Sequence, residues 1–494
     1  MTEEVARAAR IHLFRDDGQE DLCFALWYPS RGQHRTTALI QRLILPGEGD
    51  RNVHGNASFE PAYFERALTE AAGAHAGLAL LHSHPGGRGW QGMSDDDINA
   101  EQGNAGAVLG ATGFPFVGLT LAGDETWSGR FWEKTALRTY SRAWCANVRV
   151  VGDRLEMSYN EALTPRPQAT DEQIRTVSAW GEDCQADLVR LRVGIVGAGS
   201  VGGMIAEALT RTGFEDIAMI DFDHIERHNL DRSQYATRAD VGRIKVEVLA
   251  EHLRSHATSD RFTVNPVVAA VYEEEGFRAA LDCDVLFSCV DRPWGRYVLN
   301  LIAYAHLIPV VDGGIAVRRN RFGELAMADW RAHTATIGRP CLQCLGQYDP
   351  GLVQMEREGH LDDPTYIVGL AKDHPLKIRE NVFTFSMSCA SLQMLQMLSL
   401  ALAPLNRSNP GAQRYHFVGG FMEEAEFGSC HTECSFSRLI AHGDACGISV
   451  TGTRVKHHSS DTEQELSGPR WWHKMVSLPV SVFRGIRNAI ARIR

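Results

Sequence analysis

The stretch that decides the fold is VGIVGAGSVG, residues 193–202. An apolar run of four residues is followed by Gly197, Gly199 and Gly202 in the spacing G-x-G-x-x-G. Between a strand and a helix, this spacing predicts a phosphate-bearing ligand close to backbone amides at the helix N-terminus. Asp221 ends the next apolar run, where an acidic residue commonly binds a ribose. The glycines alone would fit a nicotinamide dinucleotide equally well.

Further strand-like runs follow at residues 217–220, 285–288 and 309–311, and they alternate with helical stretches. This alternation predicts an α/β fold with a parallel, helix-covered, Rossmann-like sheet. Residues 1–155 instead alternate short apolar runs with turn-forming residues around one helix near 61–74, which indicates an α+β domain. We expect a linker over 156–170, a second domain over 171–448 that opens with a helix at about 171–189 capped by Thr170, and a tail over 449–494.

The amino-acid composition argues against several classes of function and location. The 494-residue chain has a net charge of −11, which argues against nucleic acid as the main ligand. No apolar run approaches the roughly 20 residues of a membrane span, and no basic and then apolar leader begins the chain. Two of the close spacings among the eleven cysteines suggest metal binding in a reducing compartment. We therefore expect a cytoplasmic protein.

A second block distinguishes the glycine-rich region from a dehydrogenase. IDFDHIERHNLDRSQ, residues 220–234, and VGRIK, residues 241–245, resemble the ThiF/MoeB adenylyltransferases, the family that includes ubiquitin-activating enzymes. Adenylation must neutralise charge on a departing pyrophosphate, and Arg232 and Lys245 are suited to this role. The apolar run that ends in Asp291 resembles the family's magnesium-binding strand end. The resemblance implies ATP and Mg²⁺ as cofactors, bound by Gly197, Gly199, Gly202, Asp221, Asp223, Asn229, Arg232, Lys245, Asp291 and Arg296.

The family resemblance also implies a homodimer formed through the adenylation domain. Gly181 and residues 185–188 resemble the family's lead-in helix, which carries an arginine that enters the partner subunit's site. Arg175 is the nearest candidate here, about two residues out of register.

The first domain carries a different signature, HSHP at residues 82–85 followed by SDDD at residues 94–97. Two histidines one residue apart at a strand end point the same way, so both imidazoles can reach one cation. A carboxylate from the next loop would make three ligands and leave the fourth tetrahedral position open for water, as in a catalytic zinc site.

This pattern resembles the JAMM motif of JAB/MPN isopeptidases. The resemblance implies a catalytic Zn²⁺ ligated by His82, His84 and Asp97, with Ser94 at the oxyanion and Glu20 as the general base. The distance from Pro85 to Ser94 is about two residues longer than usual, so Asp95 and Asp96 remain alternative ligands. A metal-free scaffold of the same fold is the main alternative.

The paired cysteines resemble the two halves of a structural Cys₄ zinc site, formed by Cys341, Cys344, Cys430 and Cys434. Ubiquitin-activating enzymes carry a thioester cysteine after the first pair, but residues 345–388 contain none. Cys389 comes next, inside an apolar helical run, and a buried thiol is the expected role. We therefore predict no essential thioester, unless one of the paired cysteines is not a zinc ligand.

The tail from Trp471 combines basic residues with apolar positions at helical spacing. Such a helix can lie on an anionic membrane, dock in a partner groove or pack on the protein's own acidic surface.

Together the signatures predict a bacterial-type enzyme that adenylates the C-terminus of a ubiquitin-like protein, with a conjugating enzyme as a further partner. The fused JAB domain would process or deconjugate that protein. A sulfur-carrier pathway and a non-catalytic binding scaffold are the alternatives.

Overall fold

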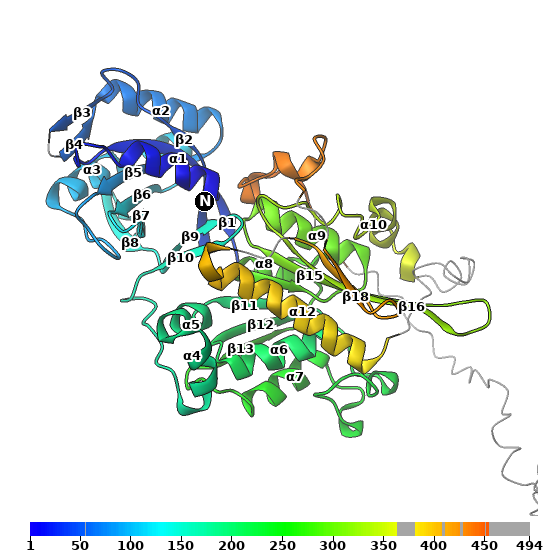
Figure 1. Ribbon diagram of the computed structural model, residues 1–494. Coiled ribbons are helices and arrows are strands. Elements are labelled where there is room, and N and C mark those ends of the chain that lie inside the picture. Colours follow the sequence, from blue (N-terminus) through cyan, green and yellow to red (C-terminus); the bar gives the residue numbers. More distant parts are fainter. Residues whose placement is uncertain (55, 363–380, 408–410, 425–427, 450, 454–494) are drawn as a thin grey trace, which may run out of the picture. The chain divides into compact units, whose positions relative to one another are not determined.

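The computed structural model describes residues 1–453 except 55, 363–380, 408–410, 425–427 and 450 (Figure 1). Residues 1–454 form one compact unit and residues 455–494 a second. The predicted tail helix lies outside the described residues.

The N-terminal part of the first unit contains a six-stranded sheet in the order β2-β1-β5-β6-β7-β8. Helix α1 covers one face and α2 and α3 cover the other, so every residue of β1 except Arg31 is buried. The predicted helix near 61–74 is confirmed as α2. The elements are α1 (Glu3–Leu13), β1 (Leu22–Arg31), β2 (Thr36–Ile44), β3 (Arg51–His54), β4 (Asn56–Phe59), α2 (Pro61–Gly73), β5 (Gly77–His84), α3 (Asp95–Thr112), β6 (Phe116–Ala122), β7 (Trp127–Ala136), β8 (Thr139–Trp144), β9 (Asn147–Val151) and β10 (Leu155–Tyr159).

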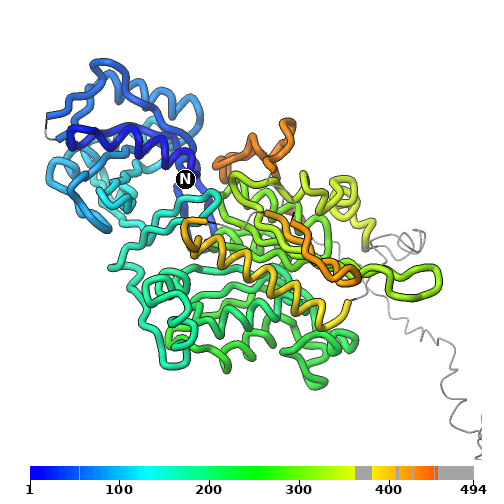
Figure 2. The backbone as a smooth tube through the Cα atoms, viewed as in Figure 1, coloured from blue at the N-terminus to red at the C-terminus, as the bar shows by residue number. Residues whose placement is uncertain are grey.

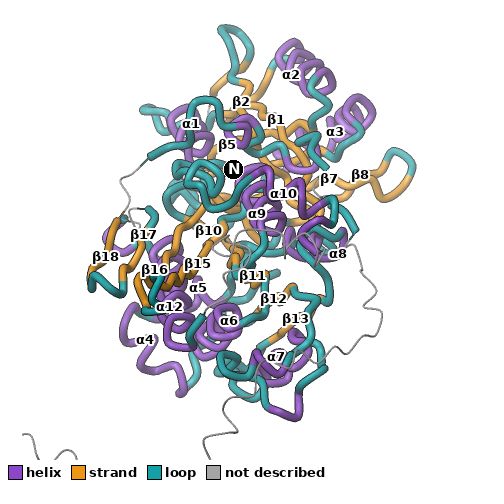
Figure 3. Tube along the Cα trace, turned by 90° about the vertical axis from the view of Figure 1, so that its right-hand side faces the viewer, coloured by secondary structure: helices purple, strands orange, loops and turns teal. Residues whose placement is uncertain are grey.

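The second sheet has eight strands in the order β13-β12-β11-β14-β15-β16-β17-β18. The first five are parallel and the last three are added antiparallel. Figure 3 shows strands of this sheet lying next to one another. The predicted Rossmann-like α/β fold is therefore confirmed. The strands are β11 (Arg192–Val196), β12 (Asp216–Ile220), β13 (Thr263–Val267), β14 (Val285–Ser288), β15 (Val310–Arg319), β16 (Leu325–Ala335), β17 (Gln413–His416) and β18 (Phe421–Glu424).

Helices cover both faces of this sheet. Residues of α8 and α9 belong to one buried cluster, and residues of α6, α7 and α12 belong to another on the opposite face. The helices are α4 (Ile174–Trp180), α5 (Glu182–Val189), α6 (Ser200–Thr212), α7 (Lys245–Arg254), α8 (Glu274–Leu281), α9 (Pro293–Ala305), α10 (Pro350–Arg357) and α12 (Phe383–Leu402).

The helix expected over residues 171–189 is broken. A 3₁₀ turn precedes α4, and Gly181, with a φ of +88°, separates α4 from α5. Positive φ values suit glycine, which has no Cβ to clash with its own backbone. The expected cap is also wrong, because the Thr170 hydroxyl donates to the Thr258 carbonyl at 2.9 Å instead.

Helix α12 is long and apolar enough to cross a membrane, which corrects the expectation that no run approaches that length. It lies on β15 and β16 and beside α6 (Figure 2). Gln393 and Gln396 are buried on it, and the Gln393 amide donates to the Val311 carbonyl at 3.0 Å. Both the packing and the polar contacts identify α12 as a core helix.

Buried side chains connect the segments of the two sheets within the first unit. Arg35 and Arg149 both lie 3.1 Å from the carboxylate of Asp284, which is 2% exposed. Ser30 Oγ lies 2.8 Å from His306 Nδ1.

Candidate functional site

The glycine-rich loop lies between β11 and α6. Gly197 has a φ of +100°, and a Cβ on Gly202 would lie only 1.9 Å from the Gly197 carbonyl oxygen. The N-cap residue of α6 is Gly199, which has no side chain with which to cap the helix. The first amides of a helix lack intrahelical acceptors, so an uncapped start next to a glycine turn can accept an anionic group.

Asp221 connects this loop to a charged cluster. Its Oδ2 accepts from the Ala198 N–H at 2.6 Å, and its Oδ1 accepts from the Asp223 N–H at 2.7 Å. Burial, with a contribution from Asp223, raises the pKa of the Asp221 carboxyl. Lys245 Nζ donates to Asp223 Oδ2 at 2.8 Å.

Lys245 stays charged in this position. Burial opposes its charge, but Asp221, Asp223 and Asp291 together raise the pKa of its ammonium. Asp291 follows β14 and is exposed. The structure thus gathers a protonated lysine, three carboxylates and open helix amides at the carboxyl ends of parallel strands, where ligands bind in α/β sheets.

Three of the predicted binding residues contact other groups. The Asn229 carboxamide oxygen accepts from the Glu226 N–H at 3.0 Å, and the Arg232 guanidinium donates to the His228 carbonyl at 2.8 Å. Arg296 Nε donates to Asp312 at 3.1 Å. Their roles toward a ligand stay predictions.

Sequence reasoning missed the buried group around Asp312. Asp312 accepts from Ser288 Oγ at 2.6 Å and from Arg331 at 2.7 Å, in addition to Arg296. These partners keep the pKa of its carboxyl low despite burial. An acidic residue directly after the apolar run 309–311 was the available signal.

The four paired cysteines come together as predicted. Their sulfur atoms all lie within 4.8 Å of one another, with Cys341 Sγ 3.7 Å from Cys434 Sγ. The Cys341 N–H also donates to Cys430 Sγ at 3.2 Å, a contact that favours a thiolate. The donor set and its spacing fit a tetrahedral Zn²⁺ ion.

Cys389 is buried on α12, as expected. Burial raises the pKa of its thiol to about 12. A thiol in this state is a poor nucleophile near neutral pH, because the thiolate is the reactive form.

The histidine pair at the end of β5 faces the first turn of α3. His82 Nε2 and His84 Nε2 lie 3.3 Å apart, and they lie 3.5 and 3.6 Å from the carboxylate oxygens of Asp97. Asp97 is therefore the aspartate that joins the histidines, whereas Asp96 contacts Asn56. The spacing of these three ligand atoms fits one cation.

Glu20 lies on the other side of His84. The antiparallel register pairs Leu22 of β1 with His82 of β5, and Glu20 Oε1 is 4.0 Å from His84 Nε2. Burial raises the pKa of the Glu20 carboxyl, a direction that suits a proton acceptor near neutral pH. Ser94 caps α3, where its Oγ accepts from the Asp97 N–H at 3.1 Å.

Sequence reasoning also missed the buried polar group next to His82. Thr120 Oγ1 lies 3.3 Å from His82 Nε2 and accepts from Arg130 at 2.7 Å. Arg130 forms an ion pair with Glu101, and both side chains are fully buried. Trp132 donates to the same carboxylate at 2.6 Å. Since these residues are far apart in sequence, no local pattern identified them.

The ThiF family model matches residues 170–435. This chain belongs to the ThiF family. The matched range contains the glycine-rich loop, the charged cluster and all four paired cysteines, so the resemblance to the ThiF/MoeB adenylyltransferases is confirmed. It excludes the histidine pair, and the JAB/MPN interpretation of the N-terminal part stays a prediction.

Curated relatives carry several activities in their names. The tRNA threonylcarbamoyladenosine dehydratase 2 of Saccharomyces cerevisiae is 27% identical over 42% of this chain and 45% of its own length. The SAMP-activating enzyme E1 of Haloferax volcanii is 30% identical over 33% of this chain and 57% of its own length. The molybdopterin-synthase adenylyltransferase of Escherichia coli is 29% identical over 33% of this chain and 62% of its own length. The chain thus spans about half the length of these relatives. Among solved structures, Escherichia coli MccB with succinimide matches with a TM-score of 0.42 and 17% identity, over 54% of this chain and 74% of its own.

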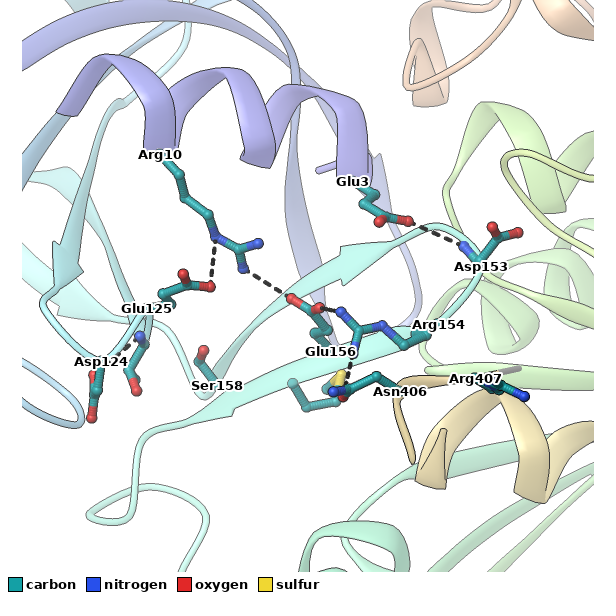
Figure 4. A pocket seen from close by; sticks show the side chains of 12 residues that line it. Glu3, Arg10, Asp124, Glu125, Asp153, Arg154, Glu156, Ser158, Asn406 and Arg407 are labelled. Carbon is teal, nitrogen blue, oxygen red and sulfur yellow. Dashed lines mark hydrogen bonds and ion pairs between the residues drawn. The ribbon is translucent and has the colours of Figure 1, made fainter. Parts of the chain in front are cut away.

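A polar hollow of about 930 Å³ lies away from both sites (Figure 4). None of the predicted site residues lines it. Four of its charged side chains pair with one another, since Arg10 contacts Glu125 and Glu156, and Arg154 contacts Glu156.

Proposed function

We propose that this ThiF-family chain adenylates the C-terminal carboxylate of a ubiquitin-like or sulfur-carrier protein. The observation that carries the proposal is the position of Lys245 and three carboxylates beside the uncapped start of α6. This arrangement suits a triphosphate, whose anionic oxygens need a helix N-terminus and a fixed cation.

In the proposed reaction, a carboxylate oxygen of the carrier attacks the α-phosphorus of ATP. The bond from that phosphorus to the bridging oxygen of the β-phosphate breaks, and pyrophosphate leaves with its electron pair. The products are the acyl-adenylate and pyrophosphate. Lys245 offsets the charge that develops on the leaving group, and the amides around Gly197 position the phosphates.

Asp291 would hold a Mg²⁺ ion, which neutralises phosphate charge when it is bound. Asp291 is exposed and contributes to the field at Lys245, so a carboxylate and a cation are available at one place. Asp221 would position the protein backbone rather than contact the ion, because its two oxygens accept hydrogen bonds from the backbone N–H groups of Ala198 and Asp223.

ATP–pyrophosphate exchange with purified candidate carriers tests the proposal. Exchange should require the carrier, fail with a carrier that lacks its terminal residue, and be lost in Asp291→Asn. Asp260→Asn is the control, because Asp260 is exposed just before β13, at the opposite end of the parallel strands from the proposed site. Nucleotide binding without exchange with either class of carrier would overturn the proposal and favour a scaffold.

The carrier class decides between two pathways. The names of the Haloferax and Escherichia coli relatives fit a small protein substrate, whereas the net charge of −11 disfavours the tRNA named for the yeast relative. Lysine-linked conjugates in cells would indicate a ubiquitin-like pathway in the cytoplasm, served by a conjugating enzyme. A thiocarboxylated carrier without conjugates would indicate sulfur transfer. A dimer formed by the ThiF region is part of the proposal, and sedimentation of the full chain tests it.

A second activity is proposed for the N-terminal part, as a zinc-dependent peptidase of the JAB/MPN kind. The converging ligand atoms of His82, His84 and Asp97 support it. A bound Zn²⁺ ion would supply a hydroxide for attack on an amide. Glu20 Oε1, which is 4.0 Å from His84 Nε2, would accept the water proton. The peptidase would expose or release the carboxylate that adenylation consumes, and fusion would raise its effective concentration.

Zinc content and cleavage together test this second activity. His84→Ala should lose one zinc per chain and cleave no peptide or isopeptide bond after the carrier tail. Glu20→Gln should keep the zinc and lose the cleavage. Equal zinc in wild type and His84→Ala would remove the site.

The Cys₄ group is proposed as a structural zinc site. It connects the segment after β16 to Cys430 and Cys434, so metal removal should destabilise this region. A chelator is expected to lower the Tm in the wild type. An unchanged Tm after proven loss of this zinc would contradict the structural role.

A further inference from the structure

A third group of metal-binding side chains lies between α6 and α7. Glu207 projects from α6, His252 from α7, and His256 from the turn after α7. One ligand atom from each residue lies within 4.8 Å of the other two. No part of the adenylation or peptidase proposals uses these residues.

Both imidazole rings lie within hydrogen-bond distance of the Glu207 carboxylate. His252 Nε2 is 3.1 Å from Glu207 Oε2, and His256 Nδ1 is 3.0 and 3.1 Å from the two Glu207 oxygens. The two imidazole centroids lie 4.2 Å apart at an interplanar angle of 72°. Both rings therefore direct a nitrogen at the same carboxylate.

Local structure fixes this arrangement. His252 and His256 are four residues apart, which places them on one side of a helical turn. The His256 N–H donates to the Leu253 carbonyl at 3.0 Å, so the chain keeps turning beyond the last residue of α7. All three side chains are partly buried, with exposures of 17% for Glu207, 24% for His252 and 32% for His256.

We propose that Glu207, His252 and His256 bind one divalent transition-metal ion of the zinc class. Two imidazoles and one carboxylate are a common protein ligand set for zinc, with water in the fourth position. Ligands at about 2.0–2.1 Å from a tetrahedral ion lie about 3.3 Å from one another. Each imidazole nitrogen lies 3.1 Å from Glu207 Oε2, which needs only a small outward shift of the rings, and the two nitrogens lie within 4.8 Å of each other.

Arg211 limits the affinity of the site. Its Nε donates to Glu207 Oε1 at 2.5 Å, which leaves Oε2 for a metal but places a positive charge nearby. Its side chain is 58% exposed and can move toward solvent. We therefore expect a site that binds reversibly.

The position of the site gives it a structural consequence. The start of α6 carries the glycine-rich loop and the start of α7 carries Lys245, whereas the proposed ligands lie toward the other ends of these helices. An ion there would fix α6 against α7 and restrict movement between the loop and Lys245. This consequence holds for any ligand bound at the loop.

Zinc content per folded chain tests the site. The full-length protein is equilibrated with zinc buffered below the concentration at which single histidines bind, and zinc is counted in wild type and in His256→Asn. Asparagine can still donate to Glu207 but lacks an imidazole, and we expect the count to fall by one. His228→Asn is the matched control, because His228 forms an exposed pair with Glu226 at 3.2 Å without a second histidine, and it should leave the count unchanged.

Two further measurements make the result decisive. Added zinc should raise the Tm of the wild type by a margin that His252→Asn/His256→Asn loses, and Arg211→Gln should tighten zinc binding several-fold. An equal zinc count in wild type and the double variant, or a Tm rise that persists in it, would overturn the proposal. Neither readout depends on adenylation activity.

Discussion

The Lys245 ammonium lies 2.8 Å from the carboxylate of Asp223, at the point where α7 begins. Asp223 is held by Asp221, which also holds the loop residue Ala198. The cation of the proposed nucleotide site and the backbone of its phosphate loop are thus connected through the carboxylate of Asp221.

Replacing Lys245 should remove most of the adenylation activity. In Lys245→Ala, we expect ATP–pyrophosphate exchange to fall by about 10²–10³-fold, the effect of losing one fixed group that stabilises transition-state charge. Arg243→Ala is the control, because Arg243 contacts Asp240 and Glu251 on the surface and should leave the exchange rate within about two-fold. Equal losses in the two variants would show that Lys245 acts through general surface charge.

Two glycines of the loop should respond differently to the same change. A Cβ on Gly202 would lie 1.9 Å from the Gly197 carbonyl oxygen, whereas a Cβ on Gly199 meets nothing within 4 Å. Gly202→Ala should lower stability by about 1–3 kcal/mol through overpacking and weaken nucleotide binding. Gly199→Ala should retain the wild-type Tm in thermal denaturation. If Gly202→Ala also kept the wild-type Tm, the tight turn described here would be wrong.

The buried ion pair beneath the histidine site should be important for stability. Glu101→Gln leaves the fully buried Arg130 without its anionic partner, which should cost about 3–5 kcal/mol. Zinc affinity should fall too, because the ion pair holds α3, which carries the proposed ligand Asp97, against β7. Glu133→Gln, on the exposed part of β7, is the control for both the Tm and the zinc measurement. A Tm as high as that of the control would contradict the proposed contribution.

Two buried histidines should make the protein sensitive to mild acid. Burial lowers the pKa of His306 to about 3 and that of His333 to about 4, from an ordinary value of 6.5. As the pH falls below 6.5 the unfolded chain takes up protons that the folded chain does not, so stability falls. Each histidine contributes up to about 1.4 kcal/mol per pH unit, or about 2 kcal/mol between pH 6.5 and 5.

Thermal denaturation at pH 7 and pH 5 measures this effect. His306→Asn cannot titrate and should show a smaller fall in Tm between the two pH values than the wild type. His34→Asn is the control, because among the described contacts only its backbone N–H is engaged, with Asp282 at 3.0 Å. A fall in Tm as large in His306→Asn as in the wild type would exclude His306 as a source of acid sensitivity.

Local patterns in the sequence predicted the features that depend on nearby residues. The strand–glycine–helix unit, the parallel strands and the histidine pair all follow from spacing along a few residues. The JAMM resemblance supplied Glu20, whose distance from His84 the β1–β5 pairing then explains.

The features that were missed depend on distant residues or on backbone conformation. Asp312 with Arg331, and Glu101 with Arg130, are pairs whose members meet only in the folded protein. The break at Gly181 requires a positive φ that an isolated glycine in a helical pattern does not reveal. Helix α12 was underestimated because Gln393 and Gln396 interrupt its apolar residues.

Those two glutamines determine how α12 can dock. The Gln393 amide donates to the Val311 carbonyl and the Gln396 amide to the Gly411 carbonyl, so both are satisfied in one orientation only. Rotation or a one-turn slide of the helix would leave these buried amides without hydrogen-bond partners, at a cost of about 1–3 kcal/mol each. A purely apolar helix of the same length would tolerate several neighbouring placements. The two glutamines bury less apolar surface than leucines would, but their hydrogen bonds fix α12 on the sheet in a single alignment.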